Sequence, residues 1–477
     1  MKYEFDLAII GAGSAGLLAA QVAPNLGLKA ALIERHRLGG DCLWTGCVPS
    51  KALIASAKAA HTIQSAERFA LPATEIEIDT AKIFARIRQK QEEIAAADDS
   101  PERFRESGVD VIIDEASIVD GHTVRAGERT LTARYILICT GSRPTAPPIP
   151  GLEEVGYLTN ETLFRLERAP RSFIIVGAGP IGVEMAQALH RLGVKITLLE
   201  QLERILVRDE PALSDTLRAV LRDEGIDMQT GVSLERARPG EGGKQLEGQV
   251  GGEPRTWCAE EILVAAGRKA NVEKLGLEQA GVEAGPKGIV VDDTLRSTVP
   301  SIYAVGDSAG RFLFTHSAAA ETSTVIRNMF YPGTRKAPEL IPWATFTDPE
   351  LAHVGATSEE ARQQHGEEGV RVFQWRFANN DRARVESATE GRMLVVTDSS
   401  FKILGAHILA PAASEMIGQF TLAMDQGVKL LPAFRDLIQI YPTFSTSFPQ
   451  LTEDAAYEQL GKPLYRGLRQ INERFGI

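Results

Sequence analysis

The chain has 477 residues, which is too long for one hydrophobic core and predicts two to four domains. Its composition is that of an ordinary soluble globular protein, and its net charge of −11 argues against a nucleic-acid-binding surface. No apolar run is long enough to span a bilayer, so we expect no membrane insertion. Four cysteines do not make a secreted disulfide scaffold, and the first residues do not resemble a signal peptide. We therefore expect a cytoplasmic protein, in which a disulfide would be catalytic rather than structural.

The sequence LAIIGAGSAGLLAAQ, residues 7–21, predicts a short strand, a tight turn and a helix. The next strand ends in Glu34, 18 residues after the last glycine of this G-x-G-x-x-G motif. Such a motif binds a dinucleotide, because glycine lets the backbone approach the pyrophosphate and the acid accepts a ribose hydroxyl. The nucleotide-binding residues predicted here are Gly11, Gly13, Ser14, Ala15, Gly16 and Glu34.

The same pattern recurs 166 positions later, in FIIVGAGPIGVEMAQALHRLGVKITLLEQ at 173–201. One copy is weak evidence, whereas two copies in ungapped register predict two nucleotide sites. The second set is Gly177, Gly179, Pro180, Ile181, Gly182 and Glu200. Glu200 would accept from the 2′-hydroxyl of NADH and repel the 2′-phosphate of NADPH. We therefore expect NADH, with NADPH as the alternative because Arg204 lies close by.

Three further apolar strands end in glycine turns, at 136–144, 262–271 and 301–310, and each predicts a return to a nucleotide-binding sheet. An aspartate after the third strand can accept from sugar-like hydroxyls, although an ordinary turn residue is the alternative. The cofactor-binding residues predicted at these turns are Thr140, Gly141, Gly267, Gly306 and Asp307.

Proline-rich and glycine-rich stretches mark the boundaries between units. A stiff link lies at 144–151, a surface hairpin is expected at 236–255, and 331–343 precedes a last α+β segment. In that segment we expect strands at 351–355, 393–398 and 402–410 and helices at 358–365, 413–427 and 431–437. The predicted fold class is α/β, with two Rossmann-like nucleotide-binding domains and a C-terminal α+β domain. The predicted domain bounds are 1–150 and 271–341 for the first nucleotide-binding domain, 151–270 for the second and 342–477 for the C-terminal domain.

Cys42 and Cys47 lie five positions apart, too far for a disulfide on an ideal helix but within reach if the helix start is distorted. Gly46 and Pro49 permit such a distortion. A helix N-terminus and Lys51 would both lower a thiol pKa there. From spacing alone, two buried reduced cysteines are an equal alternative. We expect Cys139 to be a core residue and Cys258 an idle thiol.

The stretch GGDCLWTGCVPSK, residues 39–51, resembles the signature of the flavoprotein disulfide reductases, which include glutathione reductase, lipoamide dehydrogenase and mercuric reductase. The resemblance runs nearly end to end, and it implies that the first nucleotide-binding domain is an FAD-binding domain, the second an NAD(P)-binding domain and the C-terminal α+β domain a dimerisation domain. It implies that electrons pass from a nicotinamide to FAD and then to a Cys42–Cys47 disulfide, with Cys47 as the charge-transfer thiolate and Cys42 as the interchange thiol. It also implies that Gly40 and Lys51 contact the flavin and that Glu184 pairs with Lys51. A solvated helix residue is the alternative for Glu184.

The chain departs from the family near its C-terminus. Lipoamide dehydrogenases and glutathione reductases have a His-Pro-Thr-x-x-Glu motif there, whereas this chain has Tyr441 and Thr446 in those places. Mercuric reductases have the tyrosine, but they also have a C-terminal cysteine pair that this sequence lacks after Cys258. Reductases of hypothiocyanous acid resemble it too, and such an electrophilic acceptor needs little acid catalysis. Tyr441 is a candidate catalytic residue, with a simple interface residue as the alternative.

Two functions follow. The first is an FAD-dependent NADH oxidoreductase that reduces an electrophilic small molecule or a metal ion through Cys42 and Cys47. The second is a lipoamide-dehydrogenase-like flavoprotein that serves a dedicated protein partner or complex. The family implies a homodimer in which the last domain places Tyr441 opposite the other subunit's Cys42, and no resident metal is expected.

Overall fold

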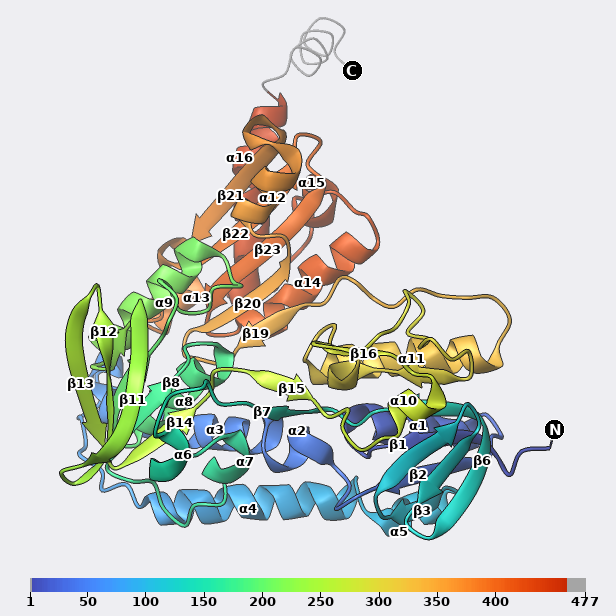
Figure 1. Ribbon diagram of the computed structural model, residues 1–477. Coiled ribbons are helices and arrows are strands. Elements are labelled where there is room, and N and C mark those ends of the chain that lie inside the picture. The colour runs from blue at the N-terminus through green and yellow to red at the C-terminus, as the bar shows by residue number, and fades with distance from the viewer. Residues whose placement is uncertain (1, 461–477) are drawn as a thin grey trace, which may run out of the picture.

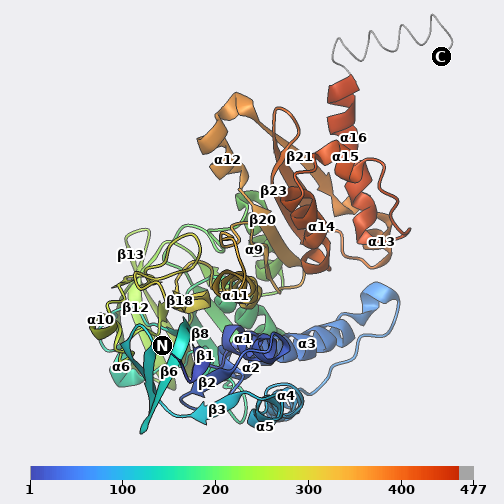
Figure 2. The same cartoon turned by 90° about the vertical axis from the view of Figure 1, so that its right-hand side faces the viewer.

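The structure is a computed structural model that describes residues 2–460 (Figure 1). These residues form three bodies, each built on its own β-sheet. The first two bodies lie side by side, and the third, orange to red, stands on them (Figures 1 and 2). The mixed α/β architecture confirms the predicted fold class.

The first body is a seven-stranded sheet with its helices. Its strands are β1 (Phe5–Ile10), β2 (Ala30–Glu34), β3 (Asp110–Ile113), β4 (Ala116–Asp120), β5 (Thr123–Ala126), β6 (Arg129–Ile138) and β18 (Ile302–Ala304). Its helices are α1 (Ser14–Asn25), α2 (Gly40–Trp44), α3 (Cys47–Gln64), α4 (Thr80–Ala97), α5 (Pro101–Glu106) and α11 (Thr315–Phe330). The parallel core has the order β3-β2-β1-β6, and its strands are apolar runs because both faces are covered. Strand β18 pairs with β6, so the chain returns to this sheet after building the second body.

The second body is a parallel sheet in the order β10-β9-β8-β14, extended by an antiparallel meander. Its strands are β8 (Ser172–Val176), β9 (Lys195–Leu199), β10 (Asp227–Gln229), β11 (Val232–Gly240), β12 (Gly243–Val250), β13 (Glu253–Ala259) and β14 (Glu261–Val264), and its helices are α8 (Pro180–Arg191) and α9 (Pro211–Asp223). The expected hairpin at 236–255 forms part of the meander β11-β12-β13, seen at the left of Figure 1.

Short elements connect the first two bodies. They are β7 (Ser142–Pro144), α6 (Leu152–Val155), α7 (Asn160–Leu163), β15 (Arg268–Ala270), α10 (Leu277–Ala280), β16 (Ala284–Gly285) and β17 (Gly288–Ile289). Strands β7 and β15 pair with each other, so the outward and the returning passage of the chain lie together. The domain bounds given above remain a prediction.

The third body is an antiparallel sheet in the order β19-β20-β23-β22-β21. Its elements are β19 (Trp343–Thr345), β20 (Glu350–Gly355), α12 (Ser358–His365), β21 (Val370–Arg376), α13 (Asp381–Val385), β22 (Arg392–Asp398), β23 (Ile403–Ala410), α14 (Ala413–Asp425), α15 (Leu430–Phe434) and α16 (Ser447–Leu460). The three strands and three helices expected here are confirmed to within three residues, whereas β19, β21, α13 and α16 were not predicted. Strand β21 lies at the edge of the sheet, and only one of its seven side chains is buried. The C-terminal tail after residue 460 lies outside the described residues.

Across residues 2–460, every helix is too short or too polar to cross a membrane.

Candidate active site

The two cysteines lie in two consecutive helices, a short one and a long one, within residues 39–51, which we call the redox loop. Cys42 belongs to α2, and Cys47 is the first residue of α3. The helix is interrupted at Gly46, whose φ of −123° and ψ of −109° are not helical. This break is the distortion that the spacing required for the two sulfurs to meet. Both residues are free thiols, with Cys42 half-buried and Cys47 exposed.

The two thiols differ sharply in acidity. A hydrogen bond from the Cys42 thiol lowers the pKa of Cys47 to about 6, and burial opposes this effect. The Thr315 hydroxyl, 3.4 Å from Cys47 Sγ, and the charge of Lys51 lower the pKa of Cys47 further. The same hydrogen bond, together with burial, raises the pKa of Cys42. At neutral pH Cys47 is therefore the thiolate and Cys42 the proton donor.

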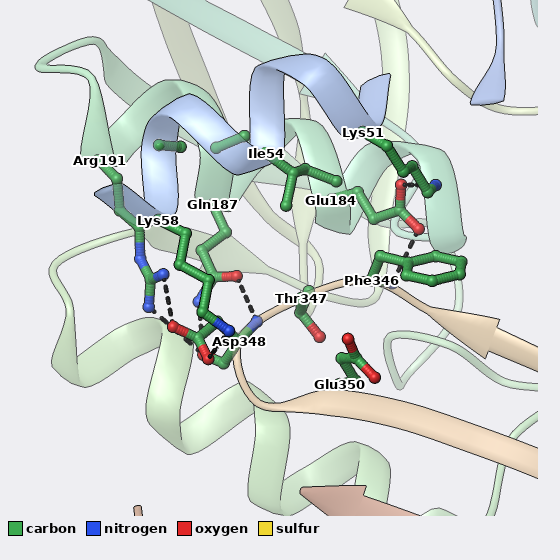
Figure 3. Close-up of a pocket in the computed structure, with 12 residues that line it drawn as sticks. Lys51, Ile54, Lys58, Glu184, Gln187, Arg191, Phe346, Thr347, Asp348 and Glu350 are labelled. Atoms are coloured by element: carbon green, nitrogen blue, oxygen red, sulfur yellow. Dashed lines mark hydrogen bonds and ion pairs between the residues drawn. The ribbon is translucent and has the colours of Figure 1, made fainter. Parts of the chain in front are cut away.

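Lys51 and Glu184 form an ion pair of 2.8 Å between α3 and α8 (Figure 3). The Glu184 side chain is 6% exposed, so the alternative of a solvated helix residue is wrong. Its second oxygen accepts from the backbone N–H of Phe346 at 2.9 Å. The pair thus joins the first two bodies and is held by the third.

The two glycine motifs have matching geometry. Gly11 and Gly177 have φ values of +101° and +103°, which favour glycine. A Cβ on Gly11 would lie 2.5 Å from the carbonyl oxygen of Cys139, and one on Gly177 would lie 2.7 Å from that of Ala265. Each first glycine therefore packs directly against the following return strand.

Both motifs leave free amides for an anion. Helices α1 and α8 follow Gly13 and Gly179, and within the described residues no side chain caps either N-terminus. A Cβ on Gly179 would meet nothing within 4 Å. These uncapped N-termini fit the phosphates of a dinucleotide.

The acids that follow the two motifs bind the glycine turns themselves. Glu34 accepts from the backbone N–H of Ala12 at 2.8 Å, and Glu200 accepts from that of Ala178 at 2.6 Å. The second oxygen of each accepts from the backbone N–H two residues further on, at 3.0 Å for Glu34 and 2.9 Å for Glu200. The repeat seen in the sequence is thus also a repeat of hydrogen bonds.

The remaining predicted cofactor residues cluster between the redox loop and β18. A Cβ on Gly40 would lie 2.6 Å from Gly13 Cα, so the redox loop packs on the first glycine turn. Gly306 and Asp307 follow β18, and Asp307 accepts from the Ser142 hydroxyl. Burial raises the pKa of Asp307. The Thr140 hydroxyl donates to Asn271 O at 2.7 Å, and Gly141 adopts a φ of +67° with open space beside it.

A cavity beside the second motif is lined by the predicted residues Gly179, Pro180, Ile181 and Gly267. Five residues that were not predicted complete its wall, among them Asn160 and Arg268. Arg268 and Asn160 both donate to Asp41, at 3.0 and 3.1 Å, directly before Cys42. Thr315 and Phe346 were also not predicted. A lone arginine after a strand or a threonine at a helix start carries no local signal, and only the fold brings these residues to the site.

Tyr441 lies apart from the two cysteines of its own chain, in the third body. It is exposed, and its hydroxyl donates to Asp381 Oδ2 at 3.0 Å, which raises the pKa of Tyr441. The Thr446 hydroxyl donates to Thr443 O at 2.6 Å. Placement of Tyr441 opposite a partner's cysteine remains a prediction.

The other two cysteines differ in exposure. Cys139 is buried and burial raises its pKa, as expected of a core residue, while Cys258 is exposed. Among the described residues no group of three or more His, Cys, Asp and Glu side chains could hold a metal ion.

Two family models match the chain. Residues 5–322 match the pyridine nucleotide-disulphide oxidoreductase family, and residues 341–452 match the dimerisation domain of the same family. The chain belongs to this family. It is a class I flavoprotein disulfide reductase, of a family that depends on FAD and a pyridine nucleotide.

Relatives of this flavoprotein disulfide reductase differ in activity. It is 34% identical to a mercuric reductase from Bacillus cereus, over 90% of this chain and 68% of that protein. It is 33% identical to a dihydrolipoyl dehydrogenase from Chlamydia pneumoniae, over 93% of this chain and 95% of that one. A solved structure, the Cu(II) complex of the HOCl-induced flavoprotein disulfide reductase RclA from Escherichia coli, matches with a TM-score of 0.82 and 28% identity over 94% of this chain and 99% of that chain.

Proposed function

We propose that this enzyme uses NADH to reduce an electrophilic small molecule or a metal ion at the Cys42–Cys47 pair. The observation that carries the choice of acceptor is Tyr441, which stands where lipoamide dehydrogenases have the acid/base histidine. Its hydrogen bond to Asp381 raises its pKa above the ordinary value of about 10, so it is a poor proton shuttle at neutral pH. An acceptor that takes electrons without such a proton donor suits this site best.

The two glycine motifs support the following assignment of the two nucleotides. FAD would be held by Gly11, Gly13, Ser14, Ala15, Gly16, Glu34, Gly40, Lys51, Thr140, Gly141, Gly306 and Asp307. NADH would be held by Gly177, Gly179, Pro180, Ile181, Gly182, Glu200 and Gly267. FAD, when bound, supplies a two-electron relay between the nicotinamide and the cysteines. Lys51 would bring a positive charge to that relay, with Glu184 holding its ammonium in place.

The cysteines would then carry the electrons to the acceptor. Cys47 accepts the proton of the Cys42 thiol along their hydrogen bond, which frees the Cys42 sulfur to attack. The Cys42 sulfur would bond to the electrophilic atom of a small-molecule acceptor, and the bond between that atom and its leaving group would break, so that the leaving group departs with the bonding electron pair. The Cys47 sulfur, after losing that proton to water, would bond to Cys42, and the acceptor would leave with the electron pair as the disulfide forms.

The relatives support a metal-ion acceptor. Mercuric reductases are among the similar proteins, and RclA has a Cu(II) complex. A metal-ion acceptor would meet two sulfur ligands at the pair, which suit soft cations. The second candidate function, a flavoprotein that serves a protein partner, is supported by the likeness to dihydrolipoyl dehydrogenases.

A homodimer is part of the proposal, as is a cytoplasmic location. The third body exposes large apolar side chains on the segments that flank Tyr441, including Ile438 at 94% and Ile440 at 81% exposed. The match to a dimerisation domain over 341–452 supports a second copy of this chain as the molecule that covers them.

Anaerobic oxidation of NADH by the FAD-loaded enzyme tests the proposal. The acceptors would be mercuric ion, cupric ion, hypothiocyanite, lipoamide, glutathione disulfide and a quinone, each with NADPH in parallel and with Cys42→Ser as the control. Fast turnover with mercuric ion, cupric ion or hypothiocyanite that is lost in the control would support it. Fast turnover with lipoamide would refute the interpretation of Tyr441, and turnover with no acceptor would favour a protein partner.

A further inference from the structure

Three buried side chains of α8 form one stripe that faces the third body. Glu184, Gln187 and Arg191 are spaced by three and four residues, which places them on the same face of the helix. All three contact residues 346–348, the connection between β19 and β20 (Figure 3). We call these three residues the 346–348 segment.

Gln187 and Arg191 hold this segment through several hydrogen bonds. The Gln187 amide accepts from the backbone N–H of Asp348 at 2.8 Å and donates to its carbonyl at 2.9 Å. The Arg191 guanidinium donates to Asp348 Oδ2 at 2.9 Å. The other two guanidinium nitrogens of Arg191, Nη2 and Nε, donate to the Glu224 carboxylate at 2.7 and 2.9 Å. This two-pronged (bidentate) contact fixes the guanidinium plane.

The segment in turn contacts both members of the Lys51–Glu184 pair. The backbone N–H of Phe346 donates to one Glu184 oxygen, and the Phe346 ring centroid lies 4.3 Å from Lys51 Nζ. Lys51 binds the other Glu184 oxygen. A shift of Phe346 would therefore remove one hydrogen bond from Glu184 and one cation–π contact from Lys51 at the same time.

We infer that Gln187 and Arg191 are positioning residues for the Lys51–Glu184 pair and act on it through the 346–348 segment. In this way the third body helps to hold the Lys51 ammonium in place beside the two cysteines. This inference rests on the proposed function, because it takes the ion pair as part of a working reductase.

The test measures Lys51 directly, in the FAD-loaded enzyme without NADH or acceptor. The rate of Lys51 acetylation by acetic anhydride, followed by mass spectrometry, reports how well the ammonium is held. Gln187→Met keeps the shape of the side chain and removes its hydrogen bonds. We expect the Lys51 rate to rise about fivefold, which corresponds to the loss of one hydrogen bond. Arg191→Lys, which keeps the charge and loses the two-pronged contact, should give a smaller rise.

Arg392→Met is the matched control. Arg392 of β22 donates to Ala212 O at 2.7 Å, so it joins the same two bodies at another place. We expect no change in the Lys51 rate for this variant. A Lys51 rate that stays at the wild-type value in both Gln187→Met and Arg191→Lys, or that rises equally in Arg392→Met, would overturn the inference.

Turnover separates this inference from the proposed function. In Gln187→Met we expect kcat to fall for the acceptor that the wild-type enzyme turns over. The KM for that acceptor should be unchanged, because the acceptor site is intact. If the enzyme reduces none of the acceptors but the Lys51 rate still rises, the positioning holds and the proposed function fails.

Discussion

Replacing Cys42 with alanine removes the thiol that donates to Cys47, and we predict that the pKa of Cys47 then rises. At a pKa of about 6, about 90% of Cys47 is thiolate at pH 7. The lost hydrogen bond is the largest contribution to this low value, and burial, which opposes it, remains. The Thr315 hydroxyl and the charge of Lys51 would still lower the pKa of Cys47 in this variant. We therefore expect a pKa between about 7.5 and 9, which leaves at most about a quarter of Cys47 ionised at pH 7.

The assay is the rate of Cys47 alkylation by iodoacetamide between pH 4.5 and 9.5, read by mass spectrometry on the reduced enzyme. All variants carry Cys258→Ser, because Cys258 is exposed and would also react. Cys42→Ser is the matched control, since its hydroxyl can still donate, and its midpoint should lie between those of the parent enzyme and Cys42→Ala. A midpoint that stays near 6 in Cys42→Ala would refute the assignment of the low pKa to this hydrogen bond.

Three further predictions follow from other contacts. Glu184→Gln removes the buried partner of Lys51, and we expect reduction of the bound flavin by NADH, measured by stopped flow, to slow at least about tenfold. Gly11→Ala places a Cβ 2.5 Å from a backbone carbonyl, so its apparent melting temperature should fall well below that of Gly27→Ala, where φ is also positive but nothing lies within 4 Å. Burial lowers the pKa values of His353 and His407 in the folded protein. The unfolded chain therefore takes up protons at these histidines first, so the free energy of unfolding is highest above about pH 6.5 and decreases as the pH falls. Burial raises the pKa of Asp209 to about 6, so this carboxyl group makes the folded protein more stable as the pH falls and opposes the effect of the two histidines. The test is the melting temperature between pH 7 and pH 5. It should fall less in His353→Phe than in the wild-type protein.

The sequence predicted the parts of the site that lie in local motifs. The two glycine turns, the break at Gly46 and the return strands follow from short patterns, and the structure has each of them. The role of β18 was also predictable, because a buried strand that ends in Gly306 is itself a local signal.

The rest depends on contacts between distant segments. Thr315 meets Cys47 across 268 positions, and Arg268 meets Asp41 across 227. Burial of Glu184 results from the third body, which covers α8 through Phe346, and no periodicity of the helix shows this. Strand β21 and helix α16 were missed because one has a single buried side chain and the other follows an irregular stretch.

The hydrogen bonds of Glu34 and Glu200 have a consequence for redesign of the nucleotide preference. Each carboxylate accepts from one backbone amide of the glycine turn and from one backbone amide two residues after itself, so each joins these two segments before any ribose binds. An arginine at 200, the obvious change toward NADPH, would leave the amides of Ala178 and Leu202 without their acceptor. An exchange of the proposed NADH preference that preserves these hydrogen bonds would keep Glu200, so positive charge added beyond it, where Arg204 already stands, would have to offset the repulsion between Glu200 and the 2′-phosphate.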